Sequence, residues 1–185
     1  MIGKIEKIIF ENENKNFFIA SIRNVFGGFE TIKILHTINK EDRTDFLYFK
    51  GDYGQKDKYG HTFSTKSFFP VSDLTIKKEV ERFKTFPKKS EGKIITKLKH
   101  YDNNLFKSKY FFTGVIKEKY FNIVIDNNID IKKITKSHDF YLTGYWFNVP
   151  NNKEEVFYCT KIEKIEKSKF KKNEIKNIKK INSFL

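Results

Sequence analysis

The sequence predicts a mainly β protein built from two small β-barrels, with a short basic helical connector between them and a basic C-terminal helix or tail. Three observations predict this organisation. Short β-rich runs alternate with turns marked by Gly or Asn, two basic stretches alternate with two nearly neutral ones, and one sequence pattern occurs in both halves. We expect barrels at residues 1–73 and 110–162, the connector at 74–109 and the tail at 163–185.

The first stretch has the features of a small barrel. Polar and apolar residues alternate from Lys4 to Phe10, and the run 17–22 is rich in β-formers. The pair Gly27-Gly28 marks a tight hairpin. The strands that we expect here are 4–10, 17–22, 31–35, 46–53 and 62–71.

The connector changes to a helical period. Asp73 can cap a helix over 74–86, which Pro87 ends. A second short helix is expected over 91–98, with Ile94, Ile95 and Leu98 directed inward. The lysines of both helices would then face solvent.

The second stretch is β-rich again and resembles the first. Strands are expected at 110–117, 120–125, 140–147 and 155–162. The run 48–53 followed by 62–66 has the same pattern as 141–146 followed by 156–161, and Gly3 is matched with Gly114 as a strand-opening glycine. We interpret the two stretches as copies of one barrel type.

The charge of the chain is strongly positive and unevenly placed. The net charge is +14 and the isoelectric point is near 9.6. The range 74–113 holds 11 basic and 4 acidic residues, and 163–185 holds 8 and 3, whereas 1–73 holds 11 and 10 and 114–162 holds 7 and 6. Such charge is typical of nucleic-acid binding. The bias toward Lys, Asn and Ile over Arg is also what an AT-rich genome produces.

The first stretch carries a recognisable series of short strings. Gly3-Lys4-Ile5-Glu6 opens a strand, Asn12-Glu13-Asn14 forms a turn before Phe17, and the strings 50–53 and 58–63 form a later hairpin with Lys-Tyr-Gly at its centre. This series resembles the N-terminal OB-type β-barrel domain of the long-form RecD-like DNA helicases, over about the first 75 residues. Asn16 stands where that family usually has Gly, Tyr53 where Trp is common, and Thr62 where Gln is common.

The resemblance implies an OB-type barrel and a DNA-processing context for the first stretch, and the repeat extends the OB type to the second. It does not imply helicase activity. The chain has no Gly-x-x-x-x-Gly-Lys-Ser/Thr loop, so no ATP-driven motor is expected.

Aromatic residues make up 17% of the chain and are interleaved with lysines. OB barrels bind single strands by stacking bases on aromatic rings while lysines follow the phosphates. A ring in a small barrel more often packs in the core, but Tyr and Trp carry a polar group that favours the surface. Tyr145 and Trp146 point to opposite faces of one strand, so we expect one of them to be exposed. The expected nucleic-acid-binding residues are Tyr53, Tyr59, Lys50, Lys58, Tyr145, Trp146, Lys88 and Lys89.

Catalytic and metal-binding patterns are not found in the sequence. The four histidines, His36, His61, His100 and His138, are scattered, and Cys159 is the only cysteine. We therefore expect no enzyme activity, no metal and no cofactor. No apolar run is long enough to cross a membrane, and we expect a cytoplasmic protein.

These observations favour a protein that binds single-stranded DNA or RNA with little sequence preference, with DNA favoured. The alternative is a protein–protein adaptor or inhibitor that acts on a nucleoprotein machine. This sequence carries a basic segment at 179–185 rather than the acidic tail typical of bacterial single-strand-binding proteins, which argues against a housekeeping role of that kind. That difference favours a specialised protein of a mobile element.

Overall fold

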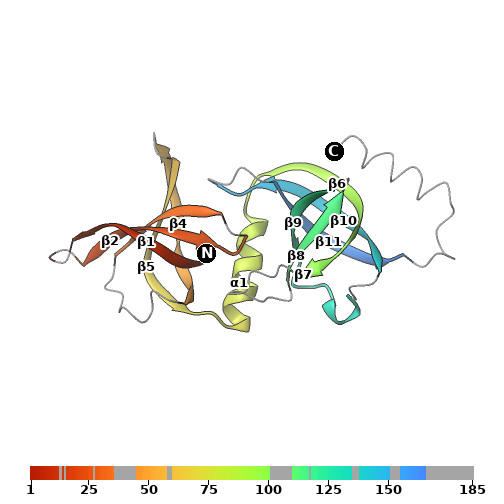
Figure 1. The fold of residues 1–185 in the computed structure, drawn as a ribbon, viewed down its shortest axis with the longest axis horizontal. Coiled ribbons are helices and arrows are strands. Elements are labelled where there is room, and N and C mark those ends of the chain that lie inside the picture. The colour runs from red at the N-terminus through yellow and green to blue at the C-terminus, as the bar shows by residue number, and fades with distance from the viewer. Residues whose placement is uncertain are drawn as a thin grey trace. The chain divides into compact units, whose positions relative to one another are not determined.

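The computed structural model describes residues 1–165 except 13, 15, 27, 36–44, 58–59, 101–109, 117, 135–137 and 151–154. The expected tail therefore lies, from residue 166 on, outside the described residues. The chain forms two compact units (Figure 1), with the boundary between Glu79 and Val80. Among the described residues, no helix has the length and hydropathy needed to cross a bilayer.

The first unit contains a closed five-stranded barrel in the order β1-β2-β3-β5-β4. All neighbouring strands are antiparallel except β3 and β5, which are parallel. This order and this one parallel pair are those of an OB barrel. Its strands are β1 (Ile2–Asn12), β2 (Phe17–Asn24), β3 (Phe29–Ile34), β4 (Phe46–Asp57) and β5 (Gly60–Pro70).

Alternation along β2 and β3 fills the core of the first barrel. Phe18, Ala20 and Ile22 of β2 are buried, as are Ile32 and Ile34 of β3. The residues between them face outward, because successive side chains of a strand point to opposite faces. A hairpin joins β2 to β3 as predicted, with Arg23 paired with Phe29 across it. The side chain of Asn24 holds its turn by accepting from the backbone N–H groups of Phe26 and Gly28.

The single α-helix among the described residues, α1 (Asp73–Lys84), confirms the helix predicted over 74–86. Its first half belongs to the first unit. There the carboxylate of Glu79, which is fully buried, lies 3.2 Å from the amino group of Met1. That amino group also donates to the Phe49 carbonyl at 2.8 Å. The second half belongs to the second unit, where Phe83 contacts Phe111 and Phe147.

The second unit repeats the strand order of the first. Its sheet runs β6-β10-β11-β9-β8-β7, with β11 and β9 as the one parallel pair. Only Leu98 separates β6 from β7, so one bent stretch of chain pairs with β10 at one end and with β8 at the other. The sheet therefore returns to its first strand, as in the first barrel. Its strands are β6 (Lys88–Lys97), β7 (Lys99–His100), β8 (Phe111–Ile116), β9 (Lys119–Ile125), β10 (Asp139–Asn148) and β11 (Glu155–Lys164).

Two sequence-based expectations about this unit are wrong. Residues 91–98 form strand β6 rather than a second helix, and the barrel begins at Lys88 rather than at residue 110. The buried positions Ile94, Thr96 and Leu98 alternate, which is a strand period. Gly114 consequently lies in the second strand of its barrel, so it does not correspond to Gly3 in the first.

The remaining part of the predicted repeat is confirmed in three dimensions. A Cβ on Gly51 would lie 1.9 Å from the Ser64 carbonyl oxygen, and a Cβ on Gly144 would lie 1.9 Å from that of Tyr158. A register shift accompanies each glycine. One residue further along, Thr65 and Cys159 donate to the carbonyl two positions ahead. The two barrels can therefore be aligned residue by residue along these strands.

Candidate nucleic-acid interface

The outward face of the first three strands of the first barrel gathers aromatic and basic side chains. Strand pairing places Phe10, Ile19 and Lys33 in one row across β1, β2 and β3, and it places Lys4, Arg23 and Phe29 in another. We call this surface the β1–β2–β3 face. Its members are Lys4, Lys7, Phe10, Phe17, Ile19, Arg23, Phe29, Thr31 and Lys33.

Rings and cations lie beside one another on the β1–β2–β3 face. Phe29 is 57% exposed and Phe10 is 48% exposed, values unusual for Phe. The Arg23 guanidinium lies 5.5 Å from the Phe29 ring centroid, and the Lys33 ammonium lies 5.5 Å from that of Phe17. The Phe17 ring is in turn 5.7 Å from the ring of Phe10. Flat rings flanked by cations are the groups that bind bases and phosphates of a single strand.

The loop before β2 is shaped by Asn16. Its backbone has a φ of 47°, the left-handed region that Gly adopts most readily and Asn tolerates. Asn16 is the position at which the helicase domains usually have Gly. The departure from the family pattern is therefore conservative in backbone terms, and it keeps the turn that brings Phe17 to the start of β2.

Two of the predicted stacking residues lie in barrel cores instead. Trp146 is 6% exposed and packs edge-on against Phe157, with ring centroids 5.1 Å apart. Tyr53 is half-buried and packs edge-on against Phe63 at 5.2 Å. Its hydroxyl donates to the carboxylate of the buried Glu30. These residues occupy equivalent positions in the two barrels, and each packs on the Phe of a neighbouring strand.

Tyr145 is also buried, at 7% exposed, so the expectation that one of Tyr145 and Trp146 is exposed is wrong. The Tyr145 ring faces outward from β10 but is stacked on Tyr158, with centroids 5.3 Å apart. The ammonium of Lys88 covers it at 4.5 Å from the centroid. Lys89 is exposed and pairs with Glu155. Among the predicted binding residues that the structure describes, Lys88 and Tyr145 are in contact.

Of the remaining predicted residues, the structure describes Lys50, which lies on β4. Lys50 is exposed and lines a hollow of about 430 Å³ beside Gly51, together with Lys66, Ser64 and Ser67. Lys58 and Tyr59 lie outside the described residues. Their part in binding stays a prediction.

A charged cluster holds the second half of α1 to its own barrel. Lys84 lies 3.2 Å from the Asp126 carboxylate and 2.8 Å from that of Glu81. Burial raises the pKa of Asp126, but the Asn128 backbone N–H and Lys84 lower it more, so it lies below its usual value. Burial and the neighbouring Asp126 raise the pKa of Tyr158, whose hydroxyl donates to that carboxylate at 3.1 Å. The cluster satisfies its own charges, which indicates a structural role.

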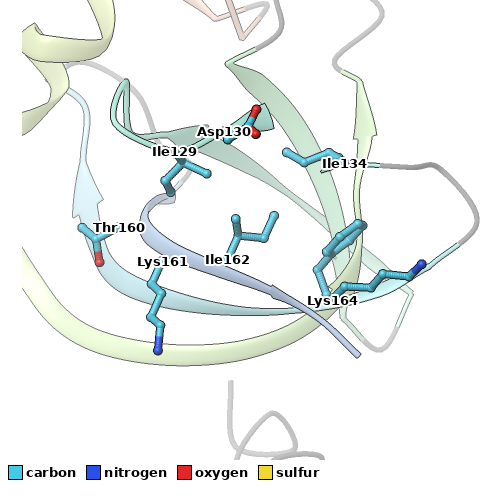
Figure 2. A pocket seen from close by; sticks show the side chains of 8 residues that line it. Ile129, Asp130, Ile134, Thr160, Lys161, Ile162 and Lys164 are labelled. Atoms are coloured by element: carbon cyan, nitrogen blue, oxygen red, sulfur yellow. The ribbon is translucent and has the colours of Figure 1, made fainter. Parts of the chain in front are cut away.

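A second pocket, of about 620 Å³, opens in the second barrel (Figure 2). Its floor is formed by Ile129, Ile134, Ile162 and the buried ring of Phe140. Figure 2 shows Asp130 on the opposite side of the opening from the lysines. An aliphatic floor without an exposed ring does not suit base stacking. Within the described ranges, no group of three or more His, Cys, Asp or Glu side chains could hold a metal ion.

Sequence reasoning missed the residues that carry the β1–β2–β3 face. A usable signal was present in 17–24, where the buried set Phe18, Ala20 and Ile22 leaves Phe17 and Arg23 on the outer side. Because Tyr and Trp favour surfaces more than Phe does, the sequence predicted stacking residues on β4 and β10 instead.

Comparison with known proteins agrees with the fold of the first unit. Residues 1–72 match the family described as the OB-fold domain of the ATP-dependent DNA helicase YrrC. The first barrel is therefore similar to the OB-fold domain of this helicase type. The match confirms the resemblance seen in the sequence, and it covers the barrel and none of a motor. Among curated proteins, none is similar enough to match the chain.

Solved structures give only remote likenesses. A murine DNA-binding protein bound to double-stranded DNA has 13% identity and a TM-score of 0.31, with 90% of this chain and 98% of that chain covered. The HINa domain of Ifi202 in complex with a 20-base-pair double-stranded DNA has 13% identity and a TM-score of 0.29, with 90% and 95% covered. Likeness at this level does not establish a function.

Proposed function

We propose that the protein binds single-stranded nucleic acid with little sequence preference, DNA in preference to RNA, through the β1–β2–β3 face. The observation that carries the proposal is the exposed Phe29 ring beside Arg23, with Phe10, Phe17 and Lys33 on the same face. A protein of this kind needs no catalytic residue, metal or cofactor.

The chemistry of this face favours single strands over duplex. Bases stacked inside a duplex cannot reach a ring on a protein surface, whereas the bases of a single strand can. Every base has a flat π-face, so binding by stacking tolerates many sequences. Basic residues on this face would add an electrostatic contribution to the affinity, which falls as salt rises because bound phosphates release their counterions.

The position of the face within the fold gives independent support. OB folds bind oligonucleotides on the face of their second and third strands, between the loops that join strands 1 to 2 and 4 to 5. In the first barrel those strands are β2 and β3, which carry Arg23, Phe17, Phe29 and Lys33. The match to a helicase OB domain supports a DNA-processing context.

Alanine substitution of an exposed ring tests the proposal. Phe29→Ala is expected to weaken binding to a labelled oligo-dT by about 5- to 150-fold, the range that one stacked base contributes. Fluorescence anisotropy measures the loss. Phe69→Ala is the matched control, because Phe69 is 45% exposed and lies on β5, outside the β1–β2–β3 face.

Equal effects of Phe29→Ala and Phe69→Ala would contradict the assignment of the face. A loss with Phe69→Ala alone would place the binding surface on the β4–β5 side of the barrel. Because both rings are exposed, neither substitution removes core contacts, so a change in binding is separable from a loss of fold.

A protein–protein adaptor is the second candidate, and the aliphatic pocket of Figure 2 is what favours it. A partner side chain could be buried on Ile129, Ile134 and Ile162, where a base would find no exposed ring. This candidate predicts that no oligonucleotide binds at moderate salt and that Ile162→Glu abolishes capture of a protein partner.

A further inference from the structure

The alignment of the two barrels identifies a second exposed ring at the same fold position as Phe29. In the parallel pairs, Ile34 faces Thr65 and Ile125 faces Cys159. Because Thr65 and Cys159 correspond, so do Ile34 and Ile125. Counting back five residues along each third strand aligns Phe29 with Tyr120.

Tyr120 repeats the surroundings of Phe29 with a different basic residue. It is 67% exposed, more than any other large hydrophobic residue described. The Lys99 ammonium lies 5.8 Å from its ring centroid. Lys99 pairs with Thr113 on β8, and Val115 of the same strand pairs with Tyr120, which places Lys99 and Tyr120 on one face.

Part of the outer side of the second barrel, around Phe111 and Phe147, is covered by its own chain, whereas Tyr120 stays exposed. Phe83 of α1 packs on Phe111 and Phe147, and the Phe147 ring contacts Tyr158. Val124, the counterpart of the outward-facing Lys33, is fully buried as a result. Tyr120 lies at the start of the same strand and stays exposed, although burying its ring would add apolar area to the core.

We propose that Tyr120 and Lys99 form a second single-strand-binding site, which takes one base by stacking and one phosphate by charge. The inference rests on the proposed function of the β1–β2–β3 face and extends it to the second barrel. The exposed Lys119 lies next to Tyr120 in the sequence and adds a second cation for the phosphates.

Counting bound oligonucleotides tests the second site. An oligo-dT of about eight nucleotides fits one OB fold, since such folds occupy roughly 4–16 nucleotides. Isothermal titration at low salt should give two equivalents per wild-type chain. Tyr120→Ala should leave the affinity of one bound oligonucleotide unchanged and weaken the affinity of the other about 5- to 150-fold. Tyr120→Phe keeps the ring and should retain two, and Lys99→Gln should weaken the same equivalent.

Each outcome bears on one site or on both. One equivalent in the wild type, or two unchanged equivalents in Tyr120→Ala, would overturn the second site. Two equivalents that Phe29→Ala leaves intact would contradict the proposed function of the first barrel and leave the second site in place. No binding of any oligonucleotide would overturn both. Thermal unfolding of Tyr120→Ala followed by circular dichroism checks that the variant is folded.

Discussion

At the scale of single residues, each barrel has one glycine whose backbone lies very close to the backbone of the neighbouring strand. Gly51 and Gly144 lie where a strand passes directly over the backbone of its neighbour, with no room for a side chain. The atoms in the way are carbonyl oxygens of Ser64 and Tyr158, which cannot move as a side chain can. A β-carbon at either position therefore has to displace the strand.

We predict that Gly51→Ala and Gly144→Ala each lower the free energy of unfolding by about 3 kcal/mol or more, at the upper end for overpacked sites. Gly54→Ala is the control in the same strand, because its Cβ would lie 3.4 Å from the Thr62 carbonyl oxygen, an ordinary van der Waals distance. Trp146, the only tryptophan, lies in the core of the second barrel, so its fluorescence reports the unfolding of the Gly144→Ala variant. Circular dichroism reports the unfolding of the Gly51→Ala variant. Equal unfolding midpoints for Gly51→Ala and Gly54→Ala would contradict the steric account.

Residue type alone did not reveal which rings are exposed. Tyr53 and Trp146 belong to a type that favours surfaces, yet both pack on the Phe of a neighbouring strand inside a barrel. Phe29 belongs to a type that favours cores, yet it is exposed. Alternation shows which residues share a face, but the face that remains open depends on what the rest of the chain covers.

At the scale of elements, the second half of α1 decides what the second barrel exposes. Phe83 covers the aromatic outer side of the barrel, and the Lys84–Asp126 pair anchors the end of the helix beside it. The helix itself was predictable, because Asp73 and Pro87 mark its ends. The packing of the helix on the barrel was not predictable, because a local sequence pattern does not indicate which sheet face a helix contacts.

The Asp126 anchor predicts an acid-dependent contribution to stability. The folded pKa of Asp126 lies below its ordinary value of 3.8, so the contribution is complete above that value and is lost as the pH falls through the folded pKa. Asp126→Asn should lower the free energy of unfolding of the second barrel by about 1–3 kcal/mol at pH 7. The difference from wild type should shrink below about pH 4.

Urea unfolding followed by Trp146 fluorescence between pH 3 and pH 7 measures this difference. Asp139→Asn is the control, because Asp139 is an exposed carboxylate on β10. A difference between Asp126→Asn and wild type that stays constant over the whole pH range would contradict the role of the charged pair.

Strand β6 shows where periodicity is ambiguous. Ile94, Ile95 and Leu98 fit one side of a helix, while Ile94, Thr96 and Leu98 fit one side of a strand. The pairing of β6 with the whole length of β10 decides in favour of the strand. Such pairing joins residues about fifty positions apart, and a local pattern cannot anticipate it. The hairpin from β2 to β3 is a local contact, and the sequence predicted it correctly.

At the scale of the whole molecule, a net charge of +14 and two barrels of one type favour binding to an extended polyanion. Charge alone would attract duplex and single strand alike. We propose that the exposed rings on corresponding third strands distinguish the two ligands, because stacking requires accessible bases. The central claim is therefore a preference for single strands and not affinity for nucleic acid in general.

The most direct test is fluorescence anisotropy of the wild-type protein with labelled oligo-dT, the matching RNA and a duplex, across salt from about 50 to 200 mM. We predict that oligo-dT binds more tightly than the duplex at every salt concentration, that RNA binds more weakly than DNA, and that single-strand affinity falls with a modest salt slope. Equal affinity for duplex with a steep slope would mean that the lysines act alone, and absence of binding at moderate salt would contradict the account.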